Sequence, residues 1–264
     1  MLSDKPLNGC RVLVTRPEHQ AGNLARLITE QGGNAIRFPT LAIVALDNVD
    51  EIRNALVSLD RFQWLVFISA NAVTMHHYYL DGGKINKLQS MRLAAIGRAT
   101  AEAMKNAGLP VDLVPENGYT SEALLAMPPM QQVSGQRILI VRGEGGREEL
   151  ASTLRSRGAD VDYLDVYKRI VPGIDSSEVL LLLKQGGLDI ITITSGEALQ
   201  NLLTLLGQEY HELLFAIPLV VVSDRIRQIA DNMGFKQIVV TNNPSDTAIL
   251  EAVTMCVGGI EWPN

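Results

Sequence analysis

The sequence has too few cysteines and histidines to suggest a disulfide framework or a metal site. Its 264 residues include 2 cysteines, Cys10 and Cys256, and 4 histidines without metal-ligand spacing, which we expect at the surface. No apolar run approaches the roughly 20 residues of a membrane-spanning helix, and no signal-peptide stretch precedes Cys10. We therefore expect two reduced thiols, no metal, no membrane partner and a cytoplasmic location.

Common motifs of catalysis and nucleotide binding are also missing. The chain has no GxSxG nucleophile elbow, and RGEGGRE, which starts at Arg142, fits neither GxGxxG nor the GxxxxGK[ST] phosphate loop. The formal net charge of −6 argues against general nucleic-acid binding, which depends on basic surface. The length of 264 residues and the 47% hydrophobic content suit a globular protein of two domains.

What the sequence does contain is an internal repeat. Arg16 and Arg142, each at the end of a short apolar run, lie 126 positions apart. The same offset relates further identical residues, among them Leu24 and Leu150, Gly32 and Gly158, Ser69 and Ser195, Asn106 and Asn232, and Gly108 and Gly234. One offset that holds across both halves indicates a tandem duplication, and so long a period indicates two similar domains rather than a solenoid.

Each half of the chain alternates short β-branched runs with amphipathic stretches that end at glycine. Strands buried on both faces and joined by helices predict parallel sheets of the doubly wound α/β type. The expected strands are 11–15, 35–38, 64–68, 93–96 and 111–114 in the first half, and 138–141, 161–164, 190–194, 219–222 and 238–241 in the second.

Two segments at equivalent places in the repeat break this alternation: FPTLAIVAL from Phe38 and YLDVYKRIVP from Tyr163. Both contain proline and predict extended chain without a helix directly after it. If both segments cross between the domains, each domain combines parts of the two repeats. If they do not, the domains are the repeats themselves, and periodicity alone does not decide between these arrangements.

Small polar residues follow several of the predicted strands, where open parallel sheets bind ligands. At the starts of the following helices stand Ser69, Asn71, Thr100, Ser121, Ser195 and Gly196. One interpretation is structural, because Ser and Thr cap helices by accepting backbone N–H bonds. The other is that several helix N-termini converge on one site, where their N–H groups and positive dipole ends would hold carboxylates or phosphates.

Arginines at the ends of apolar strands provide a second candidate for anion binding. Arg16 and Arg142 would stand at the edge where an anionic ligand lies, and Arg147 would extend that edge. Gly143 would let the backbone approach the ligand. The alternative for each arginine is an ion pair with a nearby acid, Glu18 or Glu144. Together these residues indicate a protein without a cofactor that binds a fairly large anion.

Eight short motifs resemble, in order, those of the uroporphyrinogen-III synthase family: VLVTRP, FPTLAI, FISANAV, AAIGRATAEAM, YTSEALL, ILIVRGEGGRE, YLDVYKR and ITSGEAL. The resemblance extends from Arg11 to about Val253. It implies two flavodoxin-like α/β domains joined by two extended linkers. On this basis residues 1–38 and 172–264 would form one domain, 44–163 the other, and 39–43 and 164–171 the linkers.

The resemblance also implies a cofactor-independent cyclising lyase of haem biosynthesis, whose substrate is the linear tetrapyrrole hydroxymethylbilane. The reaction removes water and closes the ring with inversion of ring D, which gives uroporphyrinogen III. Without the enzyme the substrate closes without inversion, so catalysis would rest mainly on orientation. The acetate and propionate groups on each ring would suit a site rich in helix N-termini.

Tyr167, in YLDVYKR, matches the family's candidate for assisting loss of the hydroxyl group. A phenol is protonated at neutral pH and can donate its proton to a leaving oxygen, whereas a purely structural Tyr167 would pack in the hinge. Thr100 matches a further site position of the family. The equivalent place in the second repeat holds Ile226, where some members have threonine, so no second threonine is assigned.

Two other hypotheses compete with the enzyme. One is a two-lobed binding or regulatory protein that holds a small anion without catalysis, although neither a secretion signal nor a DNA-binding module is evident. The other is a degenerate synthase domain with only a structural role. For the enzyme we expect a monomer with no nucleic-acid partner, which could take its substrate by transient handover from the enzyme that makes it.

Overall fold

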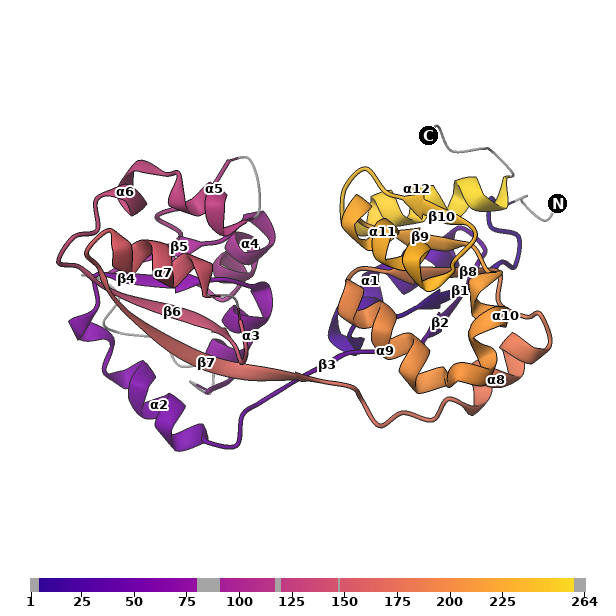
Figure 1. Cartoon of the computed structure of the whole chain (residues 1–264), viewed down its shortest axis with the longest axis horizontal. Coiled ribbons are helices and arrows are strands. Elements are labelled where there is room, and N and C mark those ends of the chain that lie inside the picture. The colour runs from indigo at the N-terminus through magenta and orange to yellow at the C-terminus, as the bar shows by residue number, and fades with distance from the viewer. Residues whose placement is uncertain (1–4, 80–90, 117–119, 147, 259–264) are drawn as a thin grey trace. The chain divides into compact units, whose positions relative to one another are not determined.

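The computed structural model describes residues 5–79, 91–116, 120–146 and 148–258, and the chain divides into two compact units (Figure 1). Unit 1 comprises Met1–Ala42 and Ile170–Asn264, and unit 2 comprises Ile43–Arg169. Within the described ranges, no helix is both long enough and apolar enough to cross a membrane.

Unit 1 is built around a five-stranded parallel sheet with the order β10-β9-β8-β1-β2. Its strands are β1 (Arg11–Val14), β2 (Asn34–Arg37), β8 (Ile190–Ile193), β9 (Leu219–Val221) and β10 (Ile238–Val240). Because side chains alternate along a strand, Leu13 and Ile191 face one layer of helices, and Val12 and Ile190 face the other. The first layer holds α8 (Ser177–Lys184), α9 (Gly196–Leu206), η3 (Gln208–Tyr210), α10 (His211–Phe215) and α11 (Asp224–Met233), and the second holds α1 (Glu18–Glu30) and α12 (Asp246–Val257).

Unit 2 repeats this plan with the strand order β3-β7-β6-β4-β5. Its strands are β3 (Ala42–Val44), β4 (Trp64–Phe67), β5 (Arg92–Ala95), β6 (Arg137–Gly143) and β7 (Asp160–Ile170). Leu139 and Val141 of β6 pack against one helix layer, and Ile138 and Ile140 pack against the other. The first layer holds α2 (Val49–Val57), η1 (Leu59–Arg61), α3 (Ala70–Tyr79) and α4 (Arg98–Asn106), and the second holds α5 (Ser121–Leu125), α6 (Pro128–Gln131) and α7 (Glu149–Ser156).

The duplication is visible in the strand pairing, residue by residue. Arg11 pairs with Asn34 in unit 1, and Arg137 pairs with Asp160 in unit 2, so each residue of the second pair lies 126 positions after its counterpart. The pairs Val12–Ile190 and Ile138–Trp64 are also equivalent, but their two members come from different repeats. Each unit therefore combines the first two strands of one repeat with later strands of the other. The predicted fold class, a duplicated flavodoxin-like α/β protein, is confirmed.

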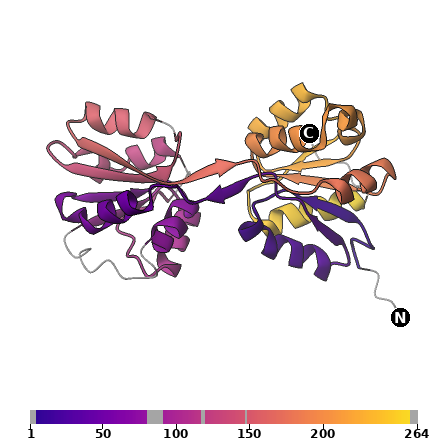
Figure 2. The same cartoon turned by 90° about the horizontal axis from the view of Figure 1, so that it is seen from below.

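The structure departs from the expected strands in two places. Residues 111–114 form a single bridge between Leu113 and Ala94 instead of a strand, because Pro110 and Pro115 bracket the segment and have no N–H to donate. The strand expected at 161–164 is the much longer β7, which continues through most of the segment expected to be a linker. The chain passes between the units within β3 and near the end of β7, two neighbouring strands that Figure 2 shows clearly.

The expectation of surface histidines is wrong for His76. Its side chain is 2% exposed, because α3 turns it to the core together with Ala72, Val73 and Tyr79. The ring lies edge-on to Phe67, with 5.2 Å between centroids, and its Nε2 atom has no hydrogen-bond partner. Burial, aided by the neighbouring His77, lowers the pKa of His76 from 6.5 to about 4.

The pKa of His76 predicts an acid-sensitive unit 2. Between pH 6.5 and 4 the unfolded chain binds a proton that the folded chain excludes, so folding loses stability as the pH falls. The shift corresponds to about 3 kcal/mol of unfolding free energy across this window. We expect His76→Leu to remove this part of the pH dependence in urea unfolding followed through Trp64 fluorescence. His19→Gln, which changes an exposed histidine of unit 1, is the matched control, and a His76→Leu curve parallel to the wild type would contradict the prediction.

Candidate active site

The carboxyl ends of the strands bring several predicted site residues to one edge of the unit 2 sheet. Gly143 ends β6 and Tyr167 lies beside it on β7, while Ser69 follows β4 and Thr100 lies in the first turn of α4, after β5. In a parallel sheet all strands end at the same edge, which is where ligands of α/β proteins bind. This edge is therefore the candidate site.

The Tyr167 hydroxyl contacts the Ser69 hydroxyl, with 3.1 Å between Oη and Oγ. Ser69 Oγ also accepts a hydrogen bond from the Ala72 N–H at 3.0 Å and so satisfies one of the free N–H groups at the start of α3. The phenol ring packs in the core, and Tyr167 is only 4% exposed. If Ser69 donates its own proton to Oη, the phenol proton is left for another acceptor, so the pair can act as a proton donor.

The N-termini of α3 and α4 are the best anion sites of this edge. Neither helix has an acidic residue in its first turn, and Gly97, the N-cap of α4, makes no side-chain cap. Their backbone N–H groups and positive dipole ends can therefore attract a carboxylate. In unit 1, by contrast, α1, α9, α11 and α12 each carry an acid in the first turn, namely Glu18, Glu197, Asp224 and Asp246.

Arg142 is held within unit 2 by nearby acids. Its Nε donates to Asp165 Oδ1 at 2.9 Å and its Nη1 to Glu148 Oε1 at 3.0 Å, and the guanidinium lies 3.5 Å from the centroid of the Tyr163 ring. Burial alone would lower the pKa of Arg142, but its hydrogen bonds to Glu148 and Asp165, together with the nearby charge of Asp165, outweigh burial and raise it. The alternative of an ion pair therefore holds for Arg142, but its partners are Glu148 and Asp165 rather than Glu144.

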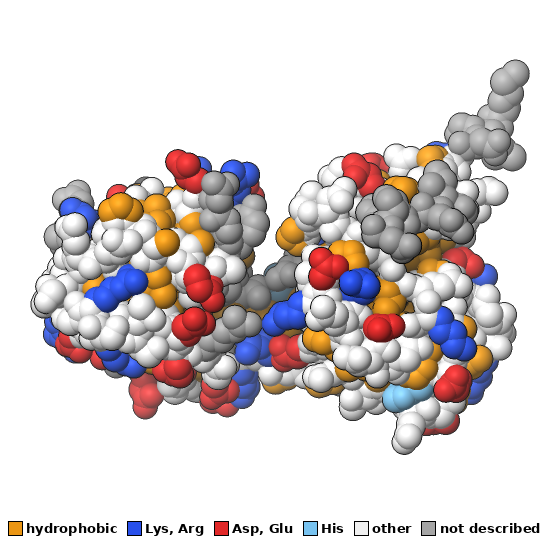
Figure 3. All heavy atoms as spheres, turned by 45° about the horizontal axis from the view of Figure 1, so that its top comes forward, with side chains coloured by type: hydrophobic (Ala, Val, Ile, Leu, Met, Phe, Trp, Pro, Cys, Tyr) orange, Lys and Arg blue, Asp and Glu red, His pale blue; other side chains and the backbone are white. Residues whose placement is uncertain are grey.

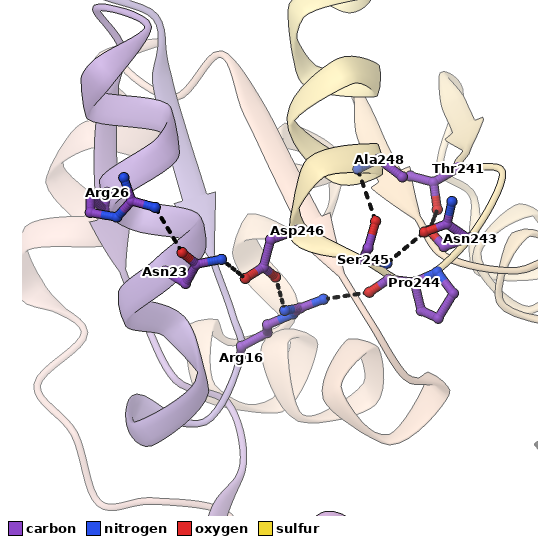
Figure 4. Close-up of polar contacts among 9 residues, drawn as sticks. All are labelled: Arg16, Asn23, Arg26, Thr241, Asn243, Pro244, Ser245, Asp246 and Ala248. Atoms are coloured by element: carbon purple, nitrogen blue, oxygen red, sulfur yellow. Dashed lines mark hydrogen bonds and ion pairs between the residues drawn. The ribbon is translucent and has the colours of Figure 1, made fainter. Parts of the chain in front are cut away.

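Arg16 is paired in a similar way at the edge of unit 1 (Figure 4). It binds Asp246 at the start of α12, and its Nη2 donates to the Pro244 carbonyl oxygen at 3.0 Å. Asn23 Nδ2 donates to the other oxygen of Asp246 at 2.6 Å. The expected partner Glu18 instead pairs with Arg37 at 3.0 Å. Sequence reasoning missed Asp246, although a first-turn acid directly after a capping serine is a usual helix-start signal.

The remaining predicted residues have separate places in the fold. Ser195 caps α9 by accepting from the Ala198 N–H at 3.0 Å, and Gly196 is the first residue of that helix, so both belong to unit 1. Ser121 begins α5, but Thr120 is the residue that caps it. Asn71, by contrast, lies in the first turn of α3, two residues after Ser69, and so belongs to the candidate site edge, where it is half-buried. Arg147 lies outside the described residues.

The two cysteines lack the character of reactive thiols. Both are free, and burial, together with the nearby Asp189 and Cys256, raises the pKa of Cys10 to about 11, while burial also raises that of Cys256. A thiol with a raised pKa is mostly protonated and is a poor nucleophile. In the part of the chain that the structure describes, no group of three or more His, Cys, Asp or Glu residues could hold a metal ion.

The surface charge is mixed on the face of each unit that Figure 3 displays. Acidic and basic side chains are interspersed there. Binding to this face would therefore depend on local groups such as helix ends rather than on a continuous basic area.

Known proteins match this chain along most of its length. A family model described as uroporphyrinogen-III synthase HemD matches residues 22–251. The uroporphyrinogen-III synthase of Salmonella typhimurium is 34% identical over 92% of this chain and 99% of its own length, and that of Escherichia coli is 32% identical with the same coverage.

Solved structures of such synthases share the fold. A mutant uroporphyrinogen III synthase from Thermus thermophilus matches with a TM-score of 0.63 and 18% identity, over 95% of this chain and 100% of that one. The Helicobacter pylori uroporphyrinogen-III synthetase matches with a TM-score of 0.61 and 15% identity, over 92% of this chain and 97% of that one. Because the family model spans residues 22–251 and the curated relatives match over nearly their whole length, the chain belongs to the uroporphyrinogen-III synthase family.

Proposed function

We propose that the chain closes hydroxymethylbilane to uroporphyrinogen III, with loss of water and inversion of ring D. The observation that carries the proposal is the contact between the Tyr167 and Ser69 hydroxyls at the carboxyl edge of the unit 2 sheet. This contact places a proton donor beside helix ends that suit carboxylates. The substrate needs a proton for its departing hydroxyl group and a site that holds its carboxylates. Membership of a family of cyclising lyases supports the same reaction.

The first step breaks the C–O bond of the substrate's hydroxymethyl group. Tyr167 donates its proton to the departing oxygen, which leaves as water, while the electrons of the attached pyrrole nitrogen form an azafulvene cation. Ser69 donates a hydrogen bond to the phenol oxygen and stabilises the negative charge left on it. Ring D then attacks through its substituted carbon, the spiro intermediate rearranges, and the proton released at the end restores the phenol.

The substrate's carboxylates are held, in this proposal, at the N-termini of α3 and α4. These helix ends have no acid in their first turns, and Thr100 adds a hydroxyl at the second of them. The charges of Arg16 and Arg142 are already matched by Asp246, Asp165 and Glu148, so the helix ends are the better anion sites. Holding the carboxylates orients the chain, and orientation decides between inverted and uninverted closure.

Three further expectations belong to the same proposal. The enzyme would act as a monomer, in the cytoplasm, and would take its unstable substrate by transient handover from the enzyme that makes it. The family resemblance supports them, and sedimentation and kinetic trapping experiments would test them.

Product analysis is the direct test of the function. Hydroxymethylbilane generated in situ is added to the purified chain, and the oxidised porphyrins are separated by isomer. We expect isomer III to dominate, because only a held substrate closes with inversion. Isomer I alone, from folded protein beside a working synthase control, would overturn the proposal and favour the binding-protein alternative.

Tyr167→Phe tests the proton donor. We expect kcat to fall by about 100-fold or more, which is typical for loss of a general acid, with KM changed little. The melting temperature should fall only slightly, because the variant loses one hydrogen bond of about 1 kcal/mol. Tyr163→Phe is the matched control, since its hydroxyl donates to Glu148 at 2.6 Å and lies outside the proposed mechanism. Unchanged turnover in folded Tyr167→Phe would remove this tyrosine from the mechanism.

A further inference from the structure

A bulge in β7 directly precedes Tyr167. The ladder between β6 and β7 is regular from Arg137–Asp160 to Arg142–Asp165, but the next pair is Gly143–Tyr167, so Val166 is an extra residue on β7. An extra residue of this kind shifts the alternation of the side chains that follow it. Bulges are frequent beside active sites because they re-aim a side chain.

The bulge decides which face of the sheet Tyr167 reaches. Before it, Val161 and Tyr163 pack towards the layer of α5 to α7, and Leu164 packs towards the layer of α2 to α4, as does the extra residue Val166. Regular alternation would put Tyr167 on the same face as Tyr163, where Arg142 lies. With the bulge, Tyr167 joins the core on the α3 side, and Ser69 starts α3 on that side.

Gly143 leaves the space that the redirected ring occupies. A Cβ atom at this position would lie 2.5 Å from Cε2 and Cζ of Tyr167 and 2.9 Å from its hydroxyl oxygen. Real side chains do not tolerate such distances, so the ring would have to move. Gly143 is not among the glycines with positive φ, so its backbone conformation would accept alanine. The absence of a side chain at Gly143 therefore makes room for the Tyr167 ring, and no turn in the backbone requires the glycine.

Contacts on both sides hold the bulge in place. Before it, the Arg142–Asp165 ion pair joins the last regular pair of the two strands. After it, the Glu144 N–H donates to the Tyr167 carbonyl oxygen at 2.8 Å. The phenol is thus fixed in its redirected position by its own strand and by β6.

The first repeat lacks both residues of this feature. The positions equivalent to Gly143 and Tyr167 are Pro17 and Leu41. The equivalent ladder, between β1 and β2, ends at the pair Val14–Arg37, before these positions. Because the shared fold needs neither residue, the glycine and the tyrosine occur together only where the proposed acid is placed.

We propose that Gly143 is a positioning residue for the Tyr167 hydroxyl in the ring-closing reaction. It acts with the bulge in β7 to hold that hydroxyl against Ser69. The proposal rests on the proposed function, because the role of Gly143 is to orient the hydroxyl from which Tyr167 gives its proton to the departing oxygen.

Gly143→Ala, made in the wild type and in Tyr167→Phe, tests the proposal. In the wild type we expect kcat to fall roughly 10- to 100-fold, as for a displacement of about 1 Å, with KM within about 3-fold. In Tyr167→Phe, where no hydroxyl remains to be aimed, the same change should lower kcat by less than about 3-fold. Gly173→Ala is the loop control, because Gly173 has no positive φ and a Cβ there meets nothing within 4 Å, and it should retain wild-type kcat.

Two results would overturn the inference: wild-type kcat in Gly143→Ala, or an equal loss in both backgrounds, which would mark a role independent of the phenol. If Gly143→Ala does not fold, Asp165→Asn loosens the bulge and is measured in the same two backgrounds, with the same criterion of coupling. Absence of isomer III from the wild type would instead contradict the proposed function itself, so the two failures are distinguishable.

Discussion

Hydrogen bonding between parallel strands that are buried on both faces is the constraint on which this structure depends. It requires apolar strands, a helix layer on each face, and crossover helices that return the chain to the same end of the sheet. Polar side chains can then gather only at the strand ends. For this reason Ser69, Thr100, Gly143 and Tyr167, which are far apart in the sequence, lie along one edge of unit 2.

The two units share a backbone plan but differ in chemistry. In unit 1, the first-turn acids of its helices compensate the helix dipoles, and Asp246 also neutralises Arg16. In unit 2, the helices that follow β4 and β5 lack such acids, and β7 carries a redirected tyrosine at the same edge. The duplication therefore produced one edge stabilised by its own charges and one edge suited to a charged ligand.

Much of the fold could be predicted because periodicity and repetition are local or regular signals. Apolar runs located nearly all the strands, and the constant offset from Arg16 to Arg142 indicated the duplication. The failures depend on tertiary context. The partners of Arg16 and Arg142 come from other segments of the chain. His76 is buried because of its position on the inward face of α3, which its residue type does not reveal. The bulge changes pairing but not composition, so Tyr167 was predicted without its orientation.

The exchange of strands between repeats has an evolutionary consequence. One repeat alone supplies β1 and β2 to unit 1 but β4 and β5 to unit 2, so it completes neither sheet. In this arrangement, two copies of a half-length ancestor would complete both sheets by trading their terminal segments, as in a domain-swapped homodimer. Gene fusion would then have joined two chains that were already interdependent. It would also have freed each half to diverge, and the helix ends of the two units now differ in their first-turn acids.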